Sequence, residues 1–141
     1  MPDFTFNTTP SIRQTAGGAA RLGALLKSLP FAATAKQVLF VTDPGIVKLG
    51  LWDAALQSIK DNGFDVTVFD AVEPDPKATT VLGGVEIAKA GNIACVVDFG
   101  GGSSMDVAKV VLSRLRSGLL LHLGCISFKC QALPDSTCLH V

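Results

Sequence analysis

Apolar positions along the chain alternate between the spacing of a helix and that of a buried strand. The first helix is predicted over residues 21–29, where leucines recur three and four positions apart and Pro30 follows. A continuous apolar run at residues 38–41 then predicts a strand buried on both faces. After Thr42-Asp43-Pro44-Gly45, a second helix is predicted up to Asn62-Gly63. Its apolar face is predicted to consist of Leu49, Trp52, Leu56 and Ile59.

The same alternation continues through the middle of the chain. Residues 64–69 predict a second strand, because they are rich in β-branched and aromatic side chains. A turn at Glu73-Pro74-Asp75-Pro76 precedes a third helix, predicted over residues 79–89 and ended by Gly91. A third strand at residues 94–97 and a fourth helix from Ser103 complete the pattern. Alternating strands and helices imply parallel pairing, so the predicted fold class is α/β, a doubly wound, mostly parallel, Rossmann-like sheet.

Two unusual loops follow predicted strands, one at Asp43 and one at Gly100. In doubly wound sheets, ligands bind beyond the carboxyl ends of the strands. We therefore expect both loops to face one crevice.

The second of these loops contains Gly100, Gly101 and Gly102, followed by Ser103 and Ser104. Glycine lets a ligand approach backbone amides closely, and a helix start adds unpaired N–H groups and partial positive charge. Together they predict an anion site suited to a diphosphate. The alternative is a plain turn in which Ser103 caps the helix and Asp106 completes a capping box. Because the loop is not G-x-G-x-x-G, spacing alone does not name its ligand.

Asp43 has two interpretations that do not exclude each other. An aspartate followed by Pro44 is a common helix start. A carboxylate at the end of this strand would also accept hydrogen bonds from a ribose and repel a 2′-phosphate, which would favour NAD over NADP. For Asp106 and Lys109, one helical turn apart, we favour a structural ion pair.

Composition narrows the function classes. The chain has 141 residues and a formal net charge of zero, so no positive field exists to attract nucleic acid or a membrane surface. Its amino terminus lacks the pattern of a secretory signal, and its most apolar stretch, residues 118–128, is short for a membrane span. We therefore expect a cytoplasmic protein with free thiols.

The chain resembles the iron-containing alcohol dehydrogenase family. The matching features, in order, are a phenylalanine-rich start with Pro10 and Gly17-Gly18, Val41-Thr42-Asp43-Pro44-Gly45 with Leu49-Gly50, Glu73-Pro74-Asp75-Pro76, and the segment from Gly100 to Lys109. The resemblance implies an NAD(P)-binding α/β domain followed by a helical domain that holds iron or zinc. In that arrangement the metal polarises an alcohol or aldehyde substrate and hydride passes to the nicotinamide.

Carried over by motif, the resemblance implies that Gly101, Gly102 and Ser103 contact the diphosphate of the dinucleotide, with Gly100 and Ser104 beside them. It implies that Asp43 binds the adenosine ribose. Asp75 stands where the family usually has asparagine, in Asn-Pro-Thr, whereas this chain has Asp-Pro-Lys.

The last part of the chain differs from the rest. We expect residues 1–112 to form the NAD(P)-binding domain and residues 113–141 to be a tail outside the family pattern, from a changed reading frame or disordered, so that the fold is truncated before the metal-binding domain. Potential replacement ligands for a metal in this tail are His122, Cys125, Cys130, Cys138 and His140, but their spacing matches no standard zinc site.

Three hypotheses of function follow. The chain is part of an NAD-dependent alcohol dehydrogenase, a nucleotide-binding module without chemistry, or an inactive fragment. An exposed domain face would favour a homo-oligomer.

Overall fold

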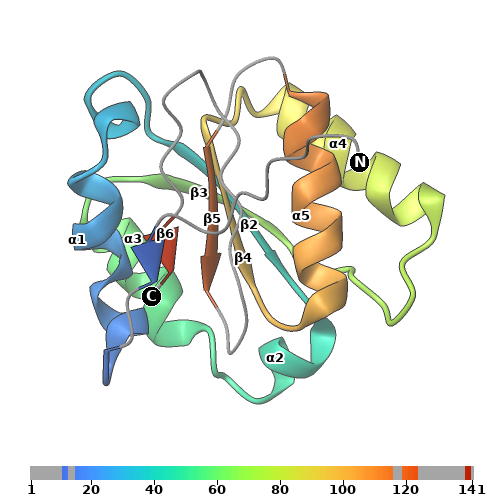
Figure 1. Ribbon diagram of the computed structural model, residues 1–141, viewed down its shortest axis with the longest axis horizontal. Coiled ribbons are helices and arrows are strands. Elements are labelled where there is room, and N and C mark those ends of the chain that lie inside the picture. The colour runs from blue at the N-terminus through green and yellow to red at the C-terminus, as the bar shows by residue number, and fades with distance from the viewer. Residues whose placement is uncertain (1–10, 13–14, 116–118, 124–138, 141) are drawn as a thin grey trace, which may run out of the picture.

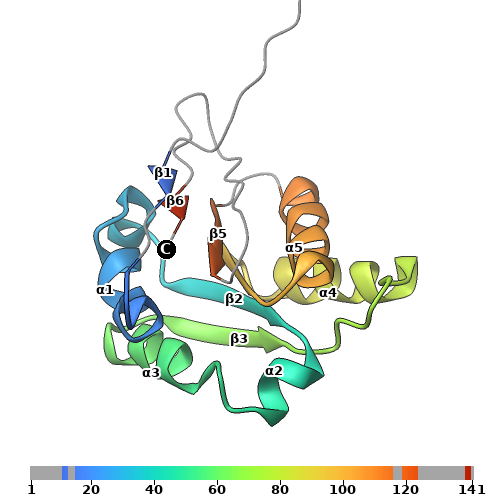
Figure 2. The same cartoon turned by 60° about the horizontal axis from the view of Figure 1, so that its bottom comes forward.

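The computed structural model consists of a parallel sheet with helices on both faces (Figures 1 and 2). It describes residues 11–12, 15–115, 119–123 and 139–140. The strand order is β1-β6-β5-β4-β2-β3, and each recorded pair is parallel. The predicted α/β, doubly wound fold class is therefore confirmed.

The strands of this sheet are β1 Ser11–Ile12, β2 Gln37–Thr42, β3 Asp65–Phe69, β4 Cys95–Phe99, β5 Leu119–Leu123 and β6 Leu139–His140. The α-helices are α1 Leu22–Lys27, α2 Pro44–Lys48, α3 Asp53–Asp61, α4 Ala78–Ala90 and α5 Gly102–Arg114. Two short 3₁₀ helices, η1 Gly18–Arg21 and η2 Pro30–Ala33, flank α1.

Strand β2 explains why helices cover both faces. Its side chains alternate between the faces, as they must in a strand, and both sets are apolar. Phe40 packs with Leu22 and Ile59 under α1 and α3. On the opposite face, Leu39 packs with Val85 of α4 and Val111 of α5. Burial on both sides makes β2 an inner strand, with β4 and β3 as its neighbours.

The helix predicted between Asp43 and Asn62 is two helices, α2 and α3. Gly50 has a φ of 65°, a left-handed conformation that interrupts the helical hydrogen bonds. The interruption turns Leu49 outward, where it is 72% exposed. Leu49 is therefore not part of the apolar face predicted for it, whereas Ile59 is buried as expected.

The predicted end of the domain falls inside α5, which continues to Arg114. Beyond it, β5 pairs with β4 in parallel, in register from Cys95 with Leu119 to Phe99 with Leu123. The sequence signal for this strand is the apolar run at residues 119–121, part of the stretch that is short for a membrane span. The division at residue 112 stays a prediction.

Candidate functional site

The Asp43 and Gly100 loops lie side by side, as the sequence predicted. They leave adjacent strands at the same edge, because Thr42 pairs with Phe99 in the parallel register of β2 and β4. From β2 the chain passes through α2 and α3 to β3 on one side, then returns through α4 to β4 on the other. The two loops therefore flank the point where the direction of strand addition reverses, the usual ligand position in such sheets. Figure 1 shows α2 and the start of α5 at this end.

Asp43 caps α2, which confirms the helix-start interpretation. Its Oδ1 accepts hydrogen bonds from the backbone N–H groups of Gly45 at 2.9 Å and Ile46 at 3.0 Å, and Pro44 occupies the first turn. The other oxygen, Oδ2, faces Gly100, since a Cβ added to that glycine would lie 3.0 Å from it. One oxygen thus stabilises α2 while the other is directed at the glycine loop.

The alternative in which Ser103 caps α5 and Asp106 completes a capping box is not what the structure shows. The helix begins at Gly102, with Gly101 as its N-cap in an extended conformation, so Ser103 already lies inside the first turn. Asp106 is too far along the helix to complete a box, and instead its Oδ1 lies 3.5 Å from Nζ of Lys109. That surface ion pair confirms the structural role expected for these two residues.

The start of α5 presents hydrogen-bond donors that the fold leaves unused. Among the described residues, no acceptor is recorded for the N–H groups of Gly102, Ser103 and Ser104, as is usual for a helix start without a side-chain cap. The hydroxyl of Ser104, which is 1% exposed, also has no hydrogen-bond partner there. These groups have the character of a site for an anion.

The three glycines of the loop differ in how much open space lies beside each of them. A Cβ on Gly100 would lie 2.8 Å from Oγ of Ser104, so this glycine is closed in by its neighbours. A Cβ on Gly101 or Gly102 would meet nothing within 4 Å. The surface above these two residues is therefore a cradle without side chains, which a bound group can approach to backbone distance. The diphosphate of a dinucleotide fits this combination of open space and unused donors.

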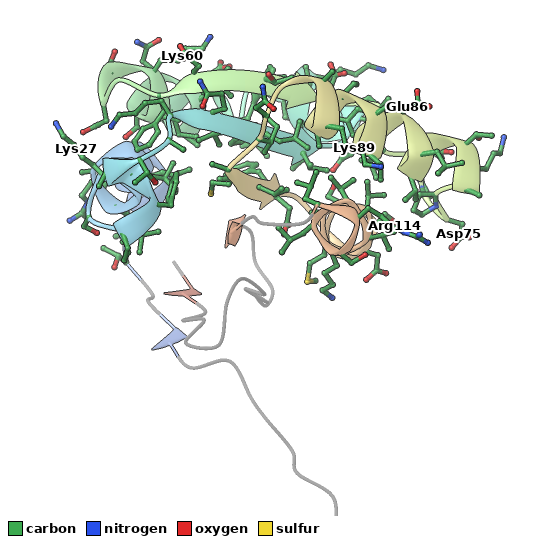
Figure 3. The ribbon with its side chains drawn as sticks, turned by 90° about the horizontal axis from the view of Figure 1, so that it is seen from above. Lys27, Lys60, Asp75, Glu86, Lys89 and Arg114 are labelled. Atoms are coloured by element: carbon green, nitrogen blue, oxygen red, sulfur yellow. The ribbon has the colours of Figure 1, made fainter. Side chains whose placement is uncertain are left out.

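Asp75 lies apart from the close contact between Asp43 and the glycine loop. It is exposed in the connection between β3 and α4, and Figure 3 shows it beyond the end of α4. Its φ of 51° gives a physical reason for the residue type, because aspartate and asparagine tolerate the left-handed region better than most residues. Its role in binding stays a prediction.

Two buried polar residues beside the loops were not singled out from the sequence. Thr42 is fully buried, and its Oγ1 donates to the backbone oxygen of Phe99 at 2.7 Å. Asp98 is fully buried in β4, paired in register with Val41 and His122. For Asp98 the signal was a carboxylate at the end of an apolar strand; nothing in the sequence distinguishes Thr42 from other threonines.

In the described residues, no group of three or more histidine, cysteine, aspartate or glutamate side chains is arranged to hold a metal ion. These residues therefore do not fit the iron or zinc that the family resemblance implies. Of the tail residues considered as ligands, His122 and His140 are in register on β5 and β6. The others, Cys125, Cys130 and Cys138, lie outside the described residues. None of the helices described here has the length and apolar character to cross a bilayer.

Fold and site together define a doubly wound α/β domain with an anion cradle where strand addition reverses. Comparison with known proteins names the family: residues 9–129 match the family model for iron-containing alcohol dehydrogenase, and the chain belongs to this family. The match includes residues 113–129, which we expected to lie in the tail outside the family pattern.

Individual relatives agree with this assignment. A choline dehydrogenase of Bacillus subtilis is 45% identical over 75 residues, which are 53% of this chain and 19% of that protein. The crystal structure of NADH-dependent butanol dehydrogenase A from Thermotoga maritima matches with a TM-score of 0.69 and 31% identity, over 81% of this chain and 28% of that one. Sulfoacetaldehyde reductase from Bifidobacterium kashiwanohense, solved in complex with NAD+, has a TM-score of 0.62 and 27% identity, over 79% and 28%. The chain thus spans between a fifth and a third of the length of these relatives.

Proposed function

We propose that this chain supplies the dinucleotide-binding part of an NAD-dependent alcohol dehydrogenase. The observation that carries the proposal is the juxtaposition of the unused donors at the start of α5 with the free oxygen of Asp43. The donors suit the diphosphate and the carboxylate suits a ribose, and both face one edge of the sheet. The sulfoacetaldehyde reductase relative, solved with NAD+, supports a dinucleotide as the ligand.

In this proposal each group has a separate task. The N–H groups of Gly102 and Ser103 donate to diphosphate oxygens, and the glycines above them exclude side chains from the space that the diphosphate fills. The Ser104 hydroxyl, left without a protein partner in the described residues, turns to donate to the same anion. Oδ2 of Asp43 accepts from the adenosine ribose, while Oδ1 keeps its hydrogen bonds to α2.

Asp43 also sets the expected preference for NAD over NADP. The 2′-phosphate of NADP would bring a second negative charge close to Oδ2, and this carboxylate cannot turn away without giving up its two hydrogen bonds to the helix. Replacing Asp43 by asparagine keeps a capping oxygen and removes the charge. We expect this variant to narrow the difference in affinity between the two cofactors.

Chemistry on an alcohol or aldehyde would come from the bound nicotinamide, which accepts or donates a hydride. The described residues offer no metal cluster to stabilise an alkoxide. We therefore derive no metal step from them and expect the purified chain to oxidise no alcohol by itself. Steady NADH formation from an alcohol, abolished by a chelator, would contradict this expectation.

Binding is the direct test of the proposal. NADH and ADP-ribose are titrated into the chain by calorimetry, with the fluorescence of the single tryptophan as a second signal. Trp52 packs on Phe40, whose ring lies 5.8 Å from that of Phe99, the residue before Gly100, so a change at the loop can reach it. We expect weak affinity, around millimolar, or about 4 kcal/mol.

A matched pair of variants tests whether the loop is the site. Gly101→Val fills the open cradle, whereas Gly83→Val adds the same side chain on α4, where the structure likewise leaves space. We expect the first variant to lose NADH binding and the second to keep it. Equal binding by both would move the site away from this loop.

The second candidate function is a nucleotide-binding module without catalysis, favoured by the absence of a metal cluster in the described residues. It shares the binding site and predicts no turnover with any metal added, so steady NADH formation from an alcohol that a chelator abolishes would exclude it. Under either function we propose a cytoplasmic protein that binds a small molecule, with association into a homo-oligomer to be tested by light scattering.

A further inference from the structure

The side chain of Thr42 links the two strand ends from which the Asp43 loop and the glycine loop leave. We propose that Thr42 is a positioning residue of the dinucleotide site: its hydroxyl ties the carboxyl ends of β2 and β4 together and so fixes the spacing between Asp43 and the glycine loop. This inference rests on the proposed function, because the spacing matters only for a ligand that contacts both.

Thr42 provides the last link between these strands before they diverge. It pairs with Phe99 in the register, is fully buried, and its Oγ1 donates to the Phe99 oxygen at 2.7 Å. One residue later, Asp43 begins to cap α2, and Pro44 has no N–H group to extend the ladder. The side chain of Thr42 therefore continues the pairing of β2 and β4 at the point where the backbone of α2 turns away.

The two residues that follow this link are the two parts of the site. Asp43 follows Thr42, and Gly100 follows Phe99. Their fit is tight, because the position of a Cβ on Gly100 lies 3.0 Å from Oδ2 of Asp43 and 2.8 Å from Oγ of Ser104. A small separation of the strand ends would move the carboxylate away from the α5 donors by a similar amount.

A ligand whose two halves are covalently linked to each other cannot follow such a movement. In adenosine diphosphate the ribose hydroxyls and the diphosphate are held at a fixed range of separations, so a changed spacing leaves one half without its hydrogen bonds. Inorganic pyrophosphate contacts only the α5 end and is insensitive to the distance to Asp43. The two ligands together distinguish a loss of spacing from a general loss of the loop.

The experiment compares Thr42→Val, which keeps the branched shape and removes the hydroxyl, with Thr42→Ser, which keeps the hydroxyl. ADP and pyrophosphate are titrated into each chain by calorimetry. We expect Thr42→Val to bind ADP about tenfold more weakly, the worth of one buried hydrogen bond, and pyrophosphate within about twofold of the unchanged chain. Thr42→Ser should resemble the unchanged chain with both ligands.

Equal ADP affinities for the two variants would overturn the inference, and so would a parallel loss of ADP and pyrophosphate in Thr42→Val. Amide hydrogen exchange provides a measurement without ligand. We expect the amides of Asp43, Gly45, Ile46, Gly100 and Gly101 to exchange faster in Thr42→Val than in Thr42→Ser at matched melting temperatures. If the two variants exchange at the same rates, the role of Thr42 is overturned even if no ligand binds. If they differ in exchange but the unchanged chain binds neither ADP nor NADH, the result counts against the proposed function alone.

Discussion

Gly23 of α1 lies where two helices approach most closely, and replacing it by alanine should destabilise the fold strongly. A Cβ at this position would overlap the backbone carbonyl of Ser58 in α3 and lie 2.7 Å from Nδ2 of Asn62. The Ser58 oxygen cannot withdraw easily, since it already accepts from the backbone N–H of Asn62 at 3.3 Å and from its side chain at 2.9 Å. The helices must therefore separate.

The cost has two parts and one offset. Overpacking of this kind costs about 1–3 kcal/mol. Separation also breaks the hydrogen bond from the Gly23 N–H to Oγ of Ser58, 3.0 Å long, which contributes about 1 kcal/mol. Alanine regains up to about 1 kcal/mol through its higher helix propensity. The net loss is roughly 1–3 kcal/mol, which lowers the melting temperature of a domain this size by roughly 5–15 °C.

Thermal unfolding followed by circular dichroism measures this change. Gly83→Ala is the matched control, because Gly83 is also helical but a Cβ there meets nothing within 4 Å. We expect the control to raise stability by about 0.5–1 kcal/mol. If Gly23→Ala melts at or above the temperature of the unchanged chain, the close packing of α1 on α3 is wrong.

Two further predictions concern the loops around the site. The pKa of Glu73 is lowered because its carboxylate accepts hydrogen bonds, first from the hydroxyl of Thr80 at 2.7 Å and also from the Lys77 N–H at 3.3 Å. A lowered pKa stabilises the fold at pH values above the ordinary pKa of 4.5, and this stability is lost as the pH falls through the pKa of the folded state. The difference in melting temperature between the unchanged chain and Glu73→Gln should therefore shrink in acid. A difference that grows in acid refutes this sign. Ser104→Ala removes a buried hydroxyl without a partner in the described residues, so the melting temperature should hold or rise while NADH affinity falls; a clear drop in melting temperature would reveal a structural hydrogen bond.

Most of the fold could be predicted from the sequence because strands buried on both faces are continuous apolar runs. The apolar runs in β2 and β4 could belong only to inner strands, and helices between them required parallel pairing. The split between α2 and α3 could not be predicted in the same way. A lone glycine inside a helical pattern is compatible with either outcome, and the left-handed φ of Gly50 is visible only in the structure.

For the site, the residue types could be predicted, but not their positions relative to the start of α5. The glycines and Asp43 were identifiable because their chemistry is local, and their adjacency followed from the strand order. Ser103 does not cap α5, because the N-cap of this helix is Gly101, two residues before Ser103. That shift also decides that Ser104 faces inward and is buried. Burial of a helical serine depends on where the helix starts, which local sequence signals fix only within a residue or two.

The N-cap of α5 indicates that this loop is organised for a ligand at some expense to the fold. Serine or aspartate at an N-cap satisfies one of the free N–H groups and typically stabilises a helix by about 1 kcal/mol relative to alanine and by roughly a few tenths of a kcal/mol relative to glycine. At Gly101 the space for such a side chain is open, yet the residue is glycine and the donors of the next residues stay available. At the start of α2, by contrast, Asp43 caps its helix with one oxygen. The same fold therefore caps the helix that presents the carboxylate and leaves uncapped the helix proposed to bind the anion, a distribution of charge that agrees with the proposed binding of a ribose joined to a diphosphate.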